Sequence, residues 1–255
     1  MKKFATLIVL AAAMLVGGQT MAQTRGAMYL GASFPMNDFA KYDGINDFAL
    51  KTVDATQAGA AIGFNAGLKW YFNVGVKGLG VMLSLDGFYN GPNSELKADY
   101  RNGSWDLQYL NGSLSYDATP KYINVPAMLG LNYLYNINPQ FGVYAEAGLG
   151  GNLRFITPME SVGKLNILGF EGSERVTQKY DNAFSFAYQF GVGVEVAKNL
   201  RIGCSIYNLG KAEVKGEETI KRTALNDNVT NTETNYRTFG TIQPVMVLGR
   251  IGFSF

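Results

Sequence analysis

Histidine is absent from the 255 residues of the chain. Histidine is the usual base of Ser-His and Cys-His nucleophile systems, and it is the commonest metal ligand in proteins. The sequence also holds no phosphate-binding glycine loop, no dinucleotide fingerprint and no Cys-x-x-Cys pair. These absences predict a protein that is not an enzyme and that uses neither a cofactor nor a metal.

Cysteine and charge are both scarce. Cys204 is the only cysteine, so the chain forms no internal disulfide. Charged residues make up 16% of the sequence, as 22 basic and 20 acidic side chains. Without Lys2 and Lys3, which belong to the leader described next, 20 basic residues face 20 acidic ones. The remaining chain is formally neutral, and no nucleic-acid partner is expected.

The beginning of the chain has the pattern of an export signal. Lys2 and Lys3 precede an apolar run over residues 4–16, and small residues follow at Thr20 and Ala22. This order predicts a signal peptide over residues 1–22, cleaved to leave residues 23–255. The alternative is an anchor helix, but the run is shorter than the roughly 20 residues that a span needs. No later apolar run is long enough for such a helix, which leaves a soluble, a surface-attached or a β-barrel protein.

Residues 184–207 alternate with a period of two, and residues 197–199 interrupt them as a turn. The bulky face consists of Phe184, Phe186, Tyr188, Phe190, Val192, Val194, Val196, Leu200, Ile202, Cys204 and Ile206. The other face is mostly small or polar and is unsuited to the inside of a soluble β-sandwich. Apolar residues facing out and polar residues facing in are typical of a transmembrane β-barrel. Cys204 lies on the apolar face, where we expect a small lipid-facing hydrophobe.

The same alternation recurs along the chain. It predicts eight strands, over residues 27–34, 60–72, 79–89, 122–135, 141–155, 184–196, 200–207 and 244–255. Short connections alternate with four long ones, over residues 36–57, 90–121, 156–182 and 210–243. The fold class is therefore all-β: an eight-stranded antiparallel up-and-down barrel with four long extracellular loops and both termini in the periplasm. Ten strands are the alternative, because residues 236–243 still alternate weakly.

The last strand ends on Phe255, with another aromatic residue, Phe253, two positions earlier. This ending resembles the C-terminal signal by which bacterial outer-membrane barrels are recognised for assembly. The strand plan as a whole resembles the small OmpA-like and OmpX-like barrel family, without a peptidoglycan-binding domain. The resemblance implies an outer-membrane location, contact with membrane lipid and lipopolysaccharide, and recognition of the last strand by the barrel assembly machinery.

Two sets of side chains follow from the alternation. The first comprises inward charges, expected to form a packed salt-bridge cluster: Lys69, Asp86, Glu146, Glu195, Arg201 and Arg250. An acid/base pair among the carboxylates is the alternative. The second comprises outward aromatic residues, expected to form a girdle at the periplasmic interface: Trp70, Phe72, Tyr133, Tyr135, Phe141, Phe253 and Phe255. Tyr89, Phe155, Phe184 and Phe186 are expected at the other interface.

Details of the barrel can also be predicted. The three-residue turn after Val196 sets a register that places Glu195 opposite Arg201, with Asn199 in the left-handed conformation. Lys69 and Arg250 are expected to reach Glu146 across the lumen. Pro126 lacks an N–H donor and is expected to produce a β-bulge.

An eight-stranded barrel is just wide enough for side chains to fill its interior. We therefore predict a structural or surface-interaction protein that acts through its long loops, on an extracellular ligand of unspecified chemistry. A narrow conduit for small or hydrophobic solutes is the alternative, because many inward positions are glycine.

Overall fold

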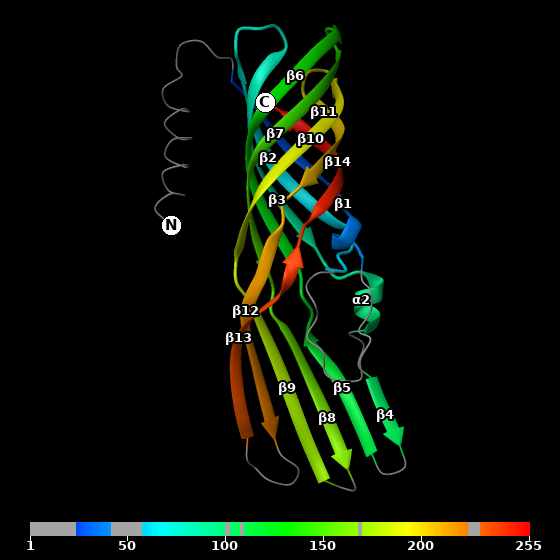
Figure 1. The fold of residues 1–255 in the computed structure, drawn as a ribbon. Helices are drawn as coiled ribbons and strands as arrows, with labels where there is room; N and C mark the ends of the chain where they lie inside the picture. Colours follow the sequence, from blue (N-terminus) through cyan, green and yellow to red (C-terminus); the bar gives the residue numbers. More distant parts are fainter. Residues whose placement is uncertain (1–23, 42–57, 100–102, 108–109, 168–169, 224–229) are drawn as a thin grey trace.

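The computed structural model describes residues 24–41, 58–99, 103–107, 110–167, 170–223 and 230–255. Eight antiparallel strands form a closed barrel in the order β1-β14-β11-β10-β7-β6-β3-β2 (Figure 1). Their bounds are β1 Thr24–Met36, β2 Gly63–Asn73, β3 Leu79–Asn90, β6 Tyr122–Asn138, β7 Phe141–Ile156, β10 Ala183–Val196, β11 Leu200–Asn208 and β14 Val245–Ser254. The predicted eight-stranded barrel is confirmed. The predicted signal peptide lies outside the described residues.

A second sheet extends from one end of the barrel, in the order β13-β12-β9-β8-β5-β4 (Figure 1). Its strands are β4 Gly103–Leu107, β5 Leu110–Ala118, β8 Met159–Ile167, β9 Phe170–Tyr180, β12 Ala212–Thr223 and β13 Thr230–Ile242. These strands occupy three of the four connections that were predicted as long loops. The ten-strand alternative is wrong, because β12 and β13 pair in this sheet and not in the barrel wall.

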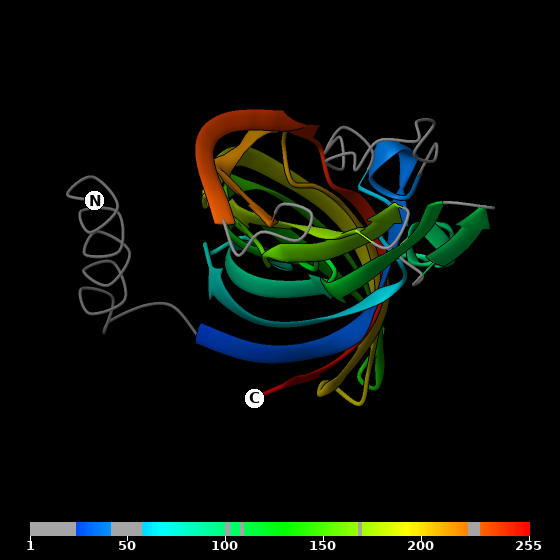
Figure 2. The same cartoon turned by 90° about the horizontal axis from the view of Figure 1, so that it is seen from below.

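The described parts of the long connections also contain two short helices, η1 Asn37–Phe39 after β1 and α2 Ser94–Asp99 after β3. Seen along its length, the barrel shows its strands arranged around a common axis, with the six-stranded sheet continuing part of the wall (Figure 2). The short turns lie at the opposite end, where the chain also ends (Figure 1).

The hairpin β10–β11 has the register that its alternation predicts. Glu195 lies opposite Arg201 and Val196 opposite Leu200. The left-handed conformation, however, belongs to Ala197 and Lys198, with φ of 51° and 65°, so its assignment to Asn199 is wrong. Two consecutive positive φ angles are typical of a type I′ turn, whose twist matches that of the strands it joins.

Pro126 produces no register shift in the described pairing of β6. Pro126 lies opposite Asn152 of β7, and the irregularity between these strands falls at residues 136–138. The pairs with β3 run from Leu85↔Ala127 to Phe88↔Asn124 in one register and leave out residues 125 and 126. The predicted bulge is wrong, because a local gap in the ladder accommodates the missing donor without an extra residue.

A buried apolar cluster fills the end of the barrel next to the six-stranded sheet. It comprises Phe39, Ala58, Ala60, Phe88, Tyr122, Met128, Ile156, Ala187, Tyr207, Leu209, Val214, Phe239, Ile242, Met246 and Leu248. Phe39 packs edge-on against Tyr122 with 5.4 Å between ring centroids, and Phe88 packs against Tyr207 at 5.1 Å. Side chains from the connections and from the barrel wall therefore share one core at this mouth.

Candidate functional site: the charged lumen and the projecting sheet

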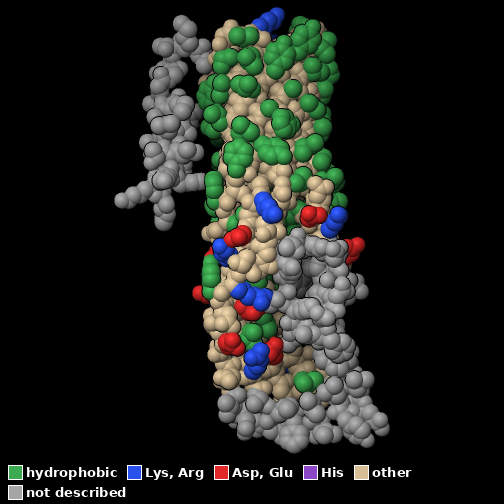
Figure 3. Space-filling model, viewed as in Figure 1, with side chains coloured by type: hydrophobic (Ala, Val, Ile, Leu, Met, Phe, Trp, Pro, Cys, Tyr) green, Lys and Arg blue, Asp and Glu red, His purple; other side chains and the backbone are tan. Residues whose placement is uncertain are grey.

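Large apolar side chains cover the outer face of the barrel. Among these exposed residues are Leu149 on β7, Phe186 on β10 and Ile251 on β14. Hydrophobic side chains dominate the barrel part of the face in Figure 3, and charged ones gather lower down, over the six-stranded sheet. An apolar band of this kind suits contact with lipid hydrocarbon.

All seven residues of the expected periplasmic girdle lie on the outer face. Tyr133, Tyr135, Phe253 and Phe255 are exposed, and Trp70, Phe72 and Phe141 are half-buried. They occupy the strand ends next to the short turns. Phe255 also joins the first strand to the last, because its backbone exchanges hydrogen bonds of 2.9 and 3.0 Å with Gly26. Cys204 is exposed on the same outer wall.

Glu146 lies at the centre of a charged cluster inside the barrel. Its carboxylate forms an ion pair with Lys69 and accepts a 2.8 Å hydrogen bond from the Tyr71 hydroxyl. The Arg201 guanidinium lies 3.5 Å from the same carboxylate. The Lys69 and Arg201 side chains are at most 1% exposed. The carboxylate is therefore held by cations and a hydroxyl, as the salt-bridge prediction requires, and not by a second carboxylate.

Two further carboxylates complete the cluster. Glu195 accepts hydrogen bonds from Arg201 Nε at 2.9 Å and from Arg25 Nη1 at 2.7 Å. Asp86 accepts a bond from Arg250 at 3.1 Å. The structure thus brings the six predicted charges into the lumen, but Arg250 pairs with Asp86 and not with Glu146 as expected. Sequence reasoning missed Arg25 because it began the first strand at Ala27, although residue 25 has the inward parity of residues 27 and 29.

Tyrosine rings separate the cations of the cluster. The Arg201 guanidinium lies over Tyr71 and Tyr144, 4.3 and 4.8 Å from their ring centroids. Arg250 lies over Tyr29 and Tyr207, at 5.3 and 5.2 Å. Rings in these positions attract the cations through their π faces and exclude water from the ion pairs.

Two inward glycines beside the charged cluster face a tyrosine side chain. Gly193 and Gly203 lie opposite each other on β10 and β11. A Cβ atom at either glycine would clash with the Tyr144 hydroxyl. These glycines therefore make room for a tyrosine side chain that fills the lumen.

Arg154 lies near the end of β7, at the mouth of the barrel next to the six-stranded sheet, and is 1% exposed. Its guanidinium donates hydrogen bonds to the carbonyl oxygens of Ile242 at 2.9 Å and Gly210 at 3.1 Å. It also donates to Asn124 Oδ1 at 3.3 Å. This arginine therefore joins the segment just before β12 and the end of β13 to the barrel wall.

The six-stranded sheet carries polar groups on both faces. At its base, Gln178 donates a hydrogen bond to Glu218 at 2.9 Å and accepts one from the Tyr180 hydroxyl at 2.8 Å. Burial and the nearby Glu218 carboxylate raise the pKa of Tyr180, so its hydroxyl remains a donor. Farther out, Arg175 pairs with Glu160, and both side chains are about a third or more exposed.

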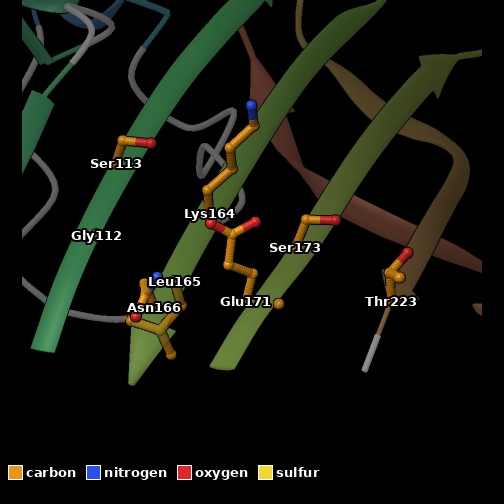
Figure 4. Close-up of a pocket in the computed structure, with 9 residues that line it drawn as sticks. Gly112, Ser113, Lys164, Leu165, Asn166, Glu171, Ser173 and Thr223 are labelled. Atoms are coloured by element: carbon orange, nitrogen blue, oxygen red, sulfur yellow. The ribbon is translucent and has the colours of Figure 1, made fainter. Parts of the chain in front are cut away.

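A pocket of about 550 Å³ lies toward the tip of this sheet. Ser113, Lys164, Ser173 and Thr223 form one cross-strand row over β5, β8, β9 and β12 in this pocket (Figure 4). Asn166 and Glu171 add an amide and a carboxylate beside the row. The pocket offers hydroxyl, amide and charged groups, which suit a polar ligand.

Within the described ranges, no group of histidine, cysteine, aspartate and glutamate side chains is arranged to hold a metal ion. No helix among the described elements is long and apolar enough to span a membrane.

A closed barrel with an apolar outer wall and a charged interior defines a transmembrane β-barrel protein. The chain belongs to the outer membrane protein β-barrel domain family, whose model matches residues 8–241. It is therefore an outer-membrane β-barrel protein, and its wall contacts membrane lipid.

Several solved structures are similar to the chain at low sequence identity. Ail, the attachment invasion locus protein of Yersinia pestis, was solved with the heparin analogue sucrose octasulfate; it is 15% identical, with 91% of this chain and 99% of Ail covered and a TM-score of 0.35. OprG from Pseudomonas aeruginosa is 14% identical over 91% of this chain and 94% of its own, with a TM-score of 0.38. CarO2 from Acinetobacter baumannii is 14% identical over 92% and 100%, with a TM-score of 0.30. No curated protein matches the chain.

Proposed function

We propose that this chain is a structural and surface-interaction protein of the outer membrane, exported by a signal peptide over residues 1–22 that is then cleaved. In this proposal the barrel anchors the protein with both termini in the periplasm, and the six-stranded sheet projects from the cell surface. The barrel assembly machinery recognises the last strand, which ends at Phe255. The protein performs no catalysis.

One observation carries the proposal. The sheet extends beyond the apolar wall, and its tip presents the polar pocket lined by Ser113, Lys164 and Ser173. Polar strands that reach past the membrane are available to partners in solution, and binding residues often occur on segments that a rigid scaffold positions. The lumen contributes rigidity, because its ion pairs and tyrosine rings are buried.

Shortening the β8–β9 hairpin tests the role of the sheet. A variant in which a two-residue Asn-Gly turn replaces residues 161–176 keeps all eight barrel strands. Both proteins are placed in lipid nanodiscs and applied to a panel of immobilised polysaccharides and extracellular proteins. We expect the full chain to bind a member of the panel and the variant to lose that binding, while both keep a folded gel mobility that boiling changes. Binding that survives the deletion would contradict the proposal.

The narrow-conduit alternative makes a different prediction. Tyr29, Tyr71 and Tyr144 are at most 7% exposed inside the barrel, and the apolar cluster fills the mouth next to the sheet. In planar bilayers we therefore expect no large, steady conductance. Stable openings of general-porin size would favour the conduit and would rule out the filled lumen.

A further inference from the structure

A groove of about 630 Å³ lies on the outer wall of the barrel. It crosses β6, β7, β10 and β11, which are neighbours in the wall (Figure 1). Two exposed small residues of β7, Ala145 and Ala147, form its floor. Ala147 lies opposite Leu131 of β6 and Phe190 of β10, and both of these large side chains are exposed. The groove therefore results from the difference in side-chain size between β7 and its two neighbours.

The groove begins at the short-turn end of the wall. Its lining extends from Leu79, the first residue of β3, to Val247, near the sheet-side end of β14. The strands of a closed barrel are tilted, so a groove that crosses them also rises along the barrel axis. It therefore leads from the membrane interface at the short turns toward the interior of the bilayer.

Hydrocarbon fits the chemistry of this groove. The lining side chains that face outward are uncharged, and all but Tyr133 are apolar. Glu146 and Asn132 also border the groove, but their side chains are buried on the lumen side of the wall. The chain belongs to an outer-membrane barrel family, so the groove is continuous with a surface that lipid covers. An acyl chain in the groove gains van der Waals contacts, the main attraction between apolar groups inside a bilayer.

A second copy of the barrel fits the groove less well. In a two-fold dimer the same patch of both subunits meets itself, and two hollows do not fill each other. A flexible acyl chain can follow the floor at Ala145 and Ala147 instead.

The β2–β3 turn supplies a cation at the short-turn end of the groove. Lys77 is exposed in this turn, two residues before Leu79, and residues 74–78 include no acidic side chain. The Gly78 carbonyl accepts a 2.7 Å hydrogen bond from the Leu134 N–H, which holds the turn against β6. Lys77 therefore lies near the place where the groove meets the interface.

Two acidic groups at the same end of the barrel do not face this turn. Glu195 is buried in the lumen, where its carboxylate bonds to Arg25 and Arg201. The terminal carboxylate of Phe255 follows β14, which β1 and β2 separate from β3. The positive charge of Lys77 is therefore available to an anionic headgroup.

We propose that this groove holds one acyl chain of an anionic phospholipid, with the phosphate of that lipid beside Lys77. The chain packs on Ala145 and Ala147 between the larger side chains of β6 and β10. The Lys77 ammonium group attracts the phosphate at the interface. The inference depends on the lipid-facing wall and not on the proposed surface interaction of the six-stranded sheet.

Photo-cross-linking in lipid vesicles tests the site. The purified protein is placed in phosphatidylcholine vesicles that contain a small fraction of phosphatidylglycerol with a diazirine in one acyl chain. After illumination, peptide mass spectrometry measures labelling along the wall. We expect residues 145–147 and 190–192 to be labelled more than Leu30 and Phe64, which are 63% and 60% exposed on β1 and β2, outside the groove. Equal labelling of these positions would overturn the inference.

Matched substitutions test the floor of the groove. Ala147→Leu fills the floor and should lower the labelling of residues 190–192 about fivefold or more, because the displaced chain loses its contacts there. Ala66→Leu, at an exposed position of β2 outside the groove, should leave this labelling unchanged. The gel mobility of unboiled protein shows whether each variant is folded. Unchanged labelling in folded Ala147→Leu would overturn the inference, and so would a dimer that this substitution dissociates.

A second pair of substitutions tests the headgroup and leaves the groove itself intact. Lys77→Gln should lower the labelling of residues 190–192 about fivefold, the factor that one lysine near an anionic membrane surface contributes. Lys198→Gln, at an exposed position of the β10–β11 turn, should leave it unchanged. Equal effects of the two substitutions would show that Lys77 does not hold the phosphate.

Discussion

The barrel and the six-stranded sheet present ion pairs to very different surroundings. In the lumen, the Lys69 and Glu146 side chains are 0% and 2% exposed. In the sheet, the Arg175 and Glu160 side chains are 47% and 31% exposed. Water solvates the second pair whether or not it is formed, whereas breaking the first leaves a buried charge without a partner. The same kind of chemical contact is therefore essential in one region and dispensable in the other.

The largest loss of stability is expected when an ion pair of the buried cluster is broken. Glu146→Gln removes the carboxylate that faces Lys69 and Arg201, and loss of one partner from a buried pair costs about 3–5 kcal/mol. Glu160→Gln is the matched substitution in the sheet and should cost about 0–1 kcal/mol. Urea unfolding, followed by the shift in gel mobility of unboiled protein, measures both. Equal losses would show that the lumen is as well solvated as the sheet.

A positive charge introduced on the outer surface should affect the barrel wall more than the six-stranded sheet. Leu149 is 59% exposed near the middle of β7, where the wall faces lipid. Leu149→Arg should lower the free energy of unfolding in lipid by about 2–4 kcal/mol, as expected for a cation near the bilayer midplane. Thr230→Arg, on exposed β13, should change it by no more than about 0.5 kcal/mol. The stability of both variants is measured in lipid vesicles. If Leu149→Arg is as stable as the unsubstituted protein, the wall at residue 149 does not face lipid.

The two regions also differ in how far the sequence predicts them. The barrel strands could be predicted because lipid on one side and a polar lumen on the other enforce a strict alternation, as in residues 184–196. The sheet strands were predicted as loops because water can solvate polar side chains on both of their faces, so residues such as Lys164 and Ser173 give no alternation of hydrophobicity. Secondary structure there depends on pairing between hairpins, which local patterns do not encode.

The alternation predicted six members of the charged cluster and two of its ion pairs, Glu195 with Arg201 and Lys69 with Glu146, but it missed Arg25 and the pairing of Arg250 with Asp86. Parity along each strand identifies Lys69, Glu146 and Arg250 as inward residues. Their partners depend on the stagger of the strands and on distances across the lumen. Lys69 and Glu146, for example, are 77 positions apart in the sequence. Arg250 accordingly pairs with Asp86 and not with Glu146. The role of the tyrosine rings as cation partners depends on the same cross-lumen geometry.

The smallest expected effect concerns the coupling between Glu195 and Arg201, which lie opposite each other on β10 and β11. Their side chains are 4% and 1% exposed and are joined by a 2.9 Å bond. Each residue keeps another partner when the other is changed, because Glu195 also bonds to Arg25 and Arg201 lies near Glu146. We therefore expect Glu195→Gln and Arg201→Gln each to lower the free energy of unfolding. The double variant should lose less stability than the sum of the two single losses, by about 0.5–3 kcal/mol.

The corresponding cycle in the sheet uses Glu174→Gln and Arg222→Gln, whose side chains are 24% and 55% exposed. Solvent screening there should make the coupling smaller than in the lumen. Urea unfolding of all six variants and the parent measures both cycles under one condition. Both pairs lie on neighbouring antiparallel strands, so cross-strand proximity is matched between them. If burial sets the strength of the pair, the coupling energy is larger in the lumen than in the sheet. Strict additivity for Glu195 and Arg201 would show that their contact contributes nothing beyond what Arg25 and Glu146 already supply.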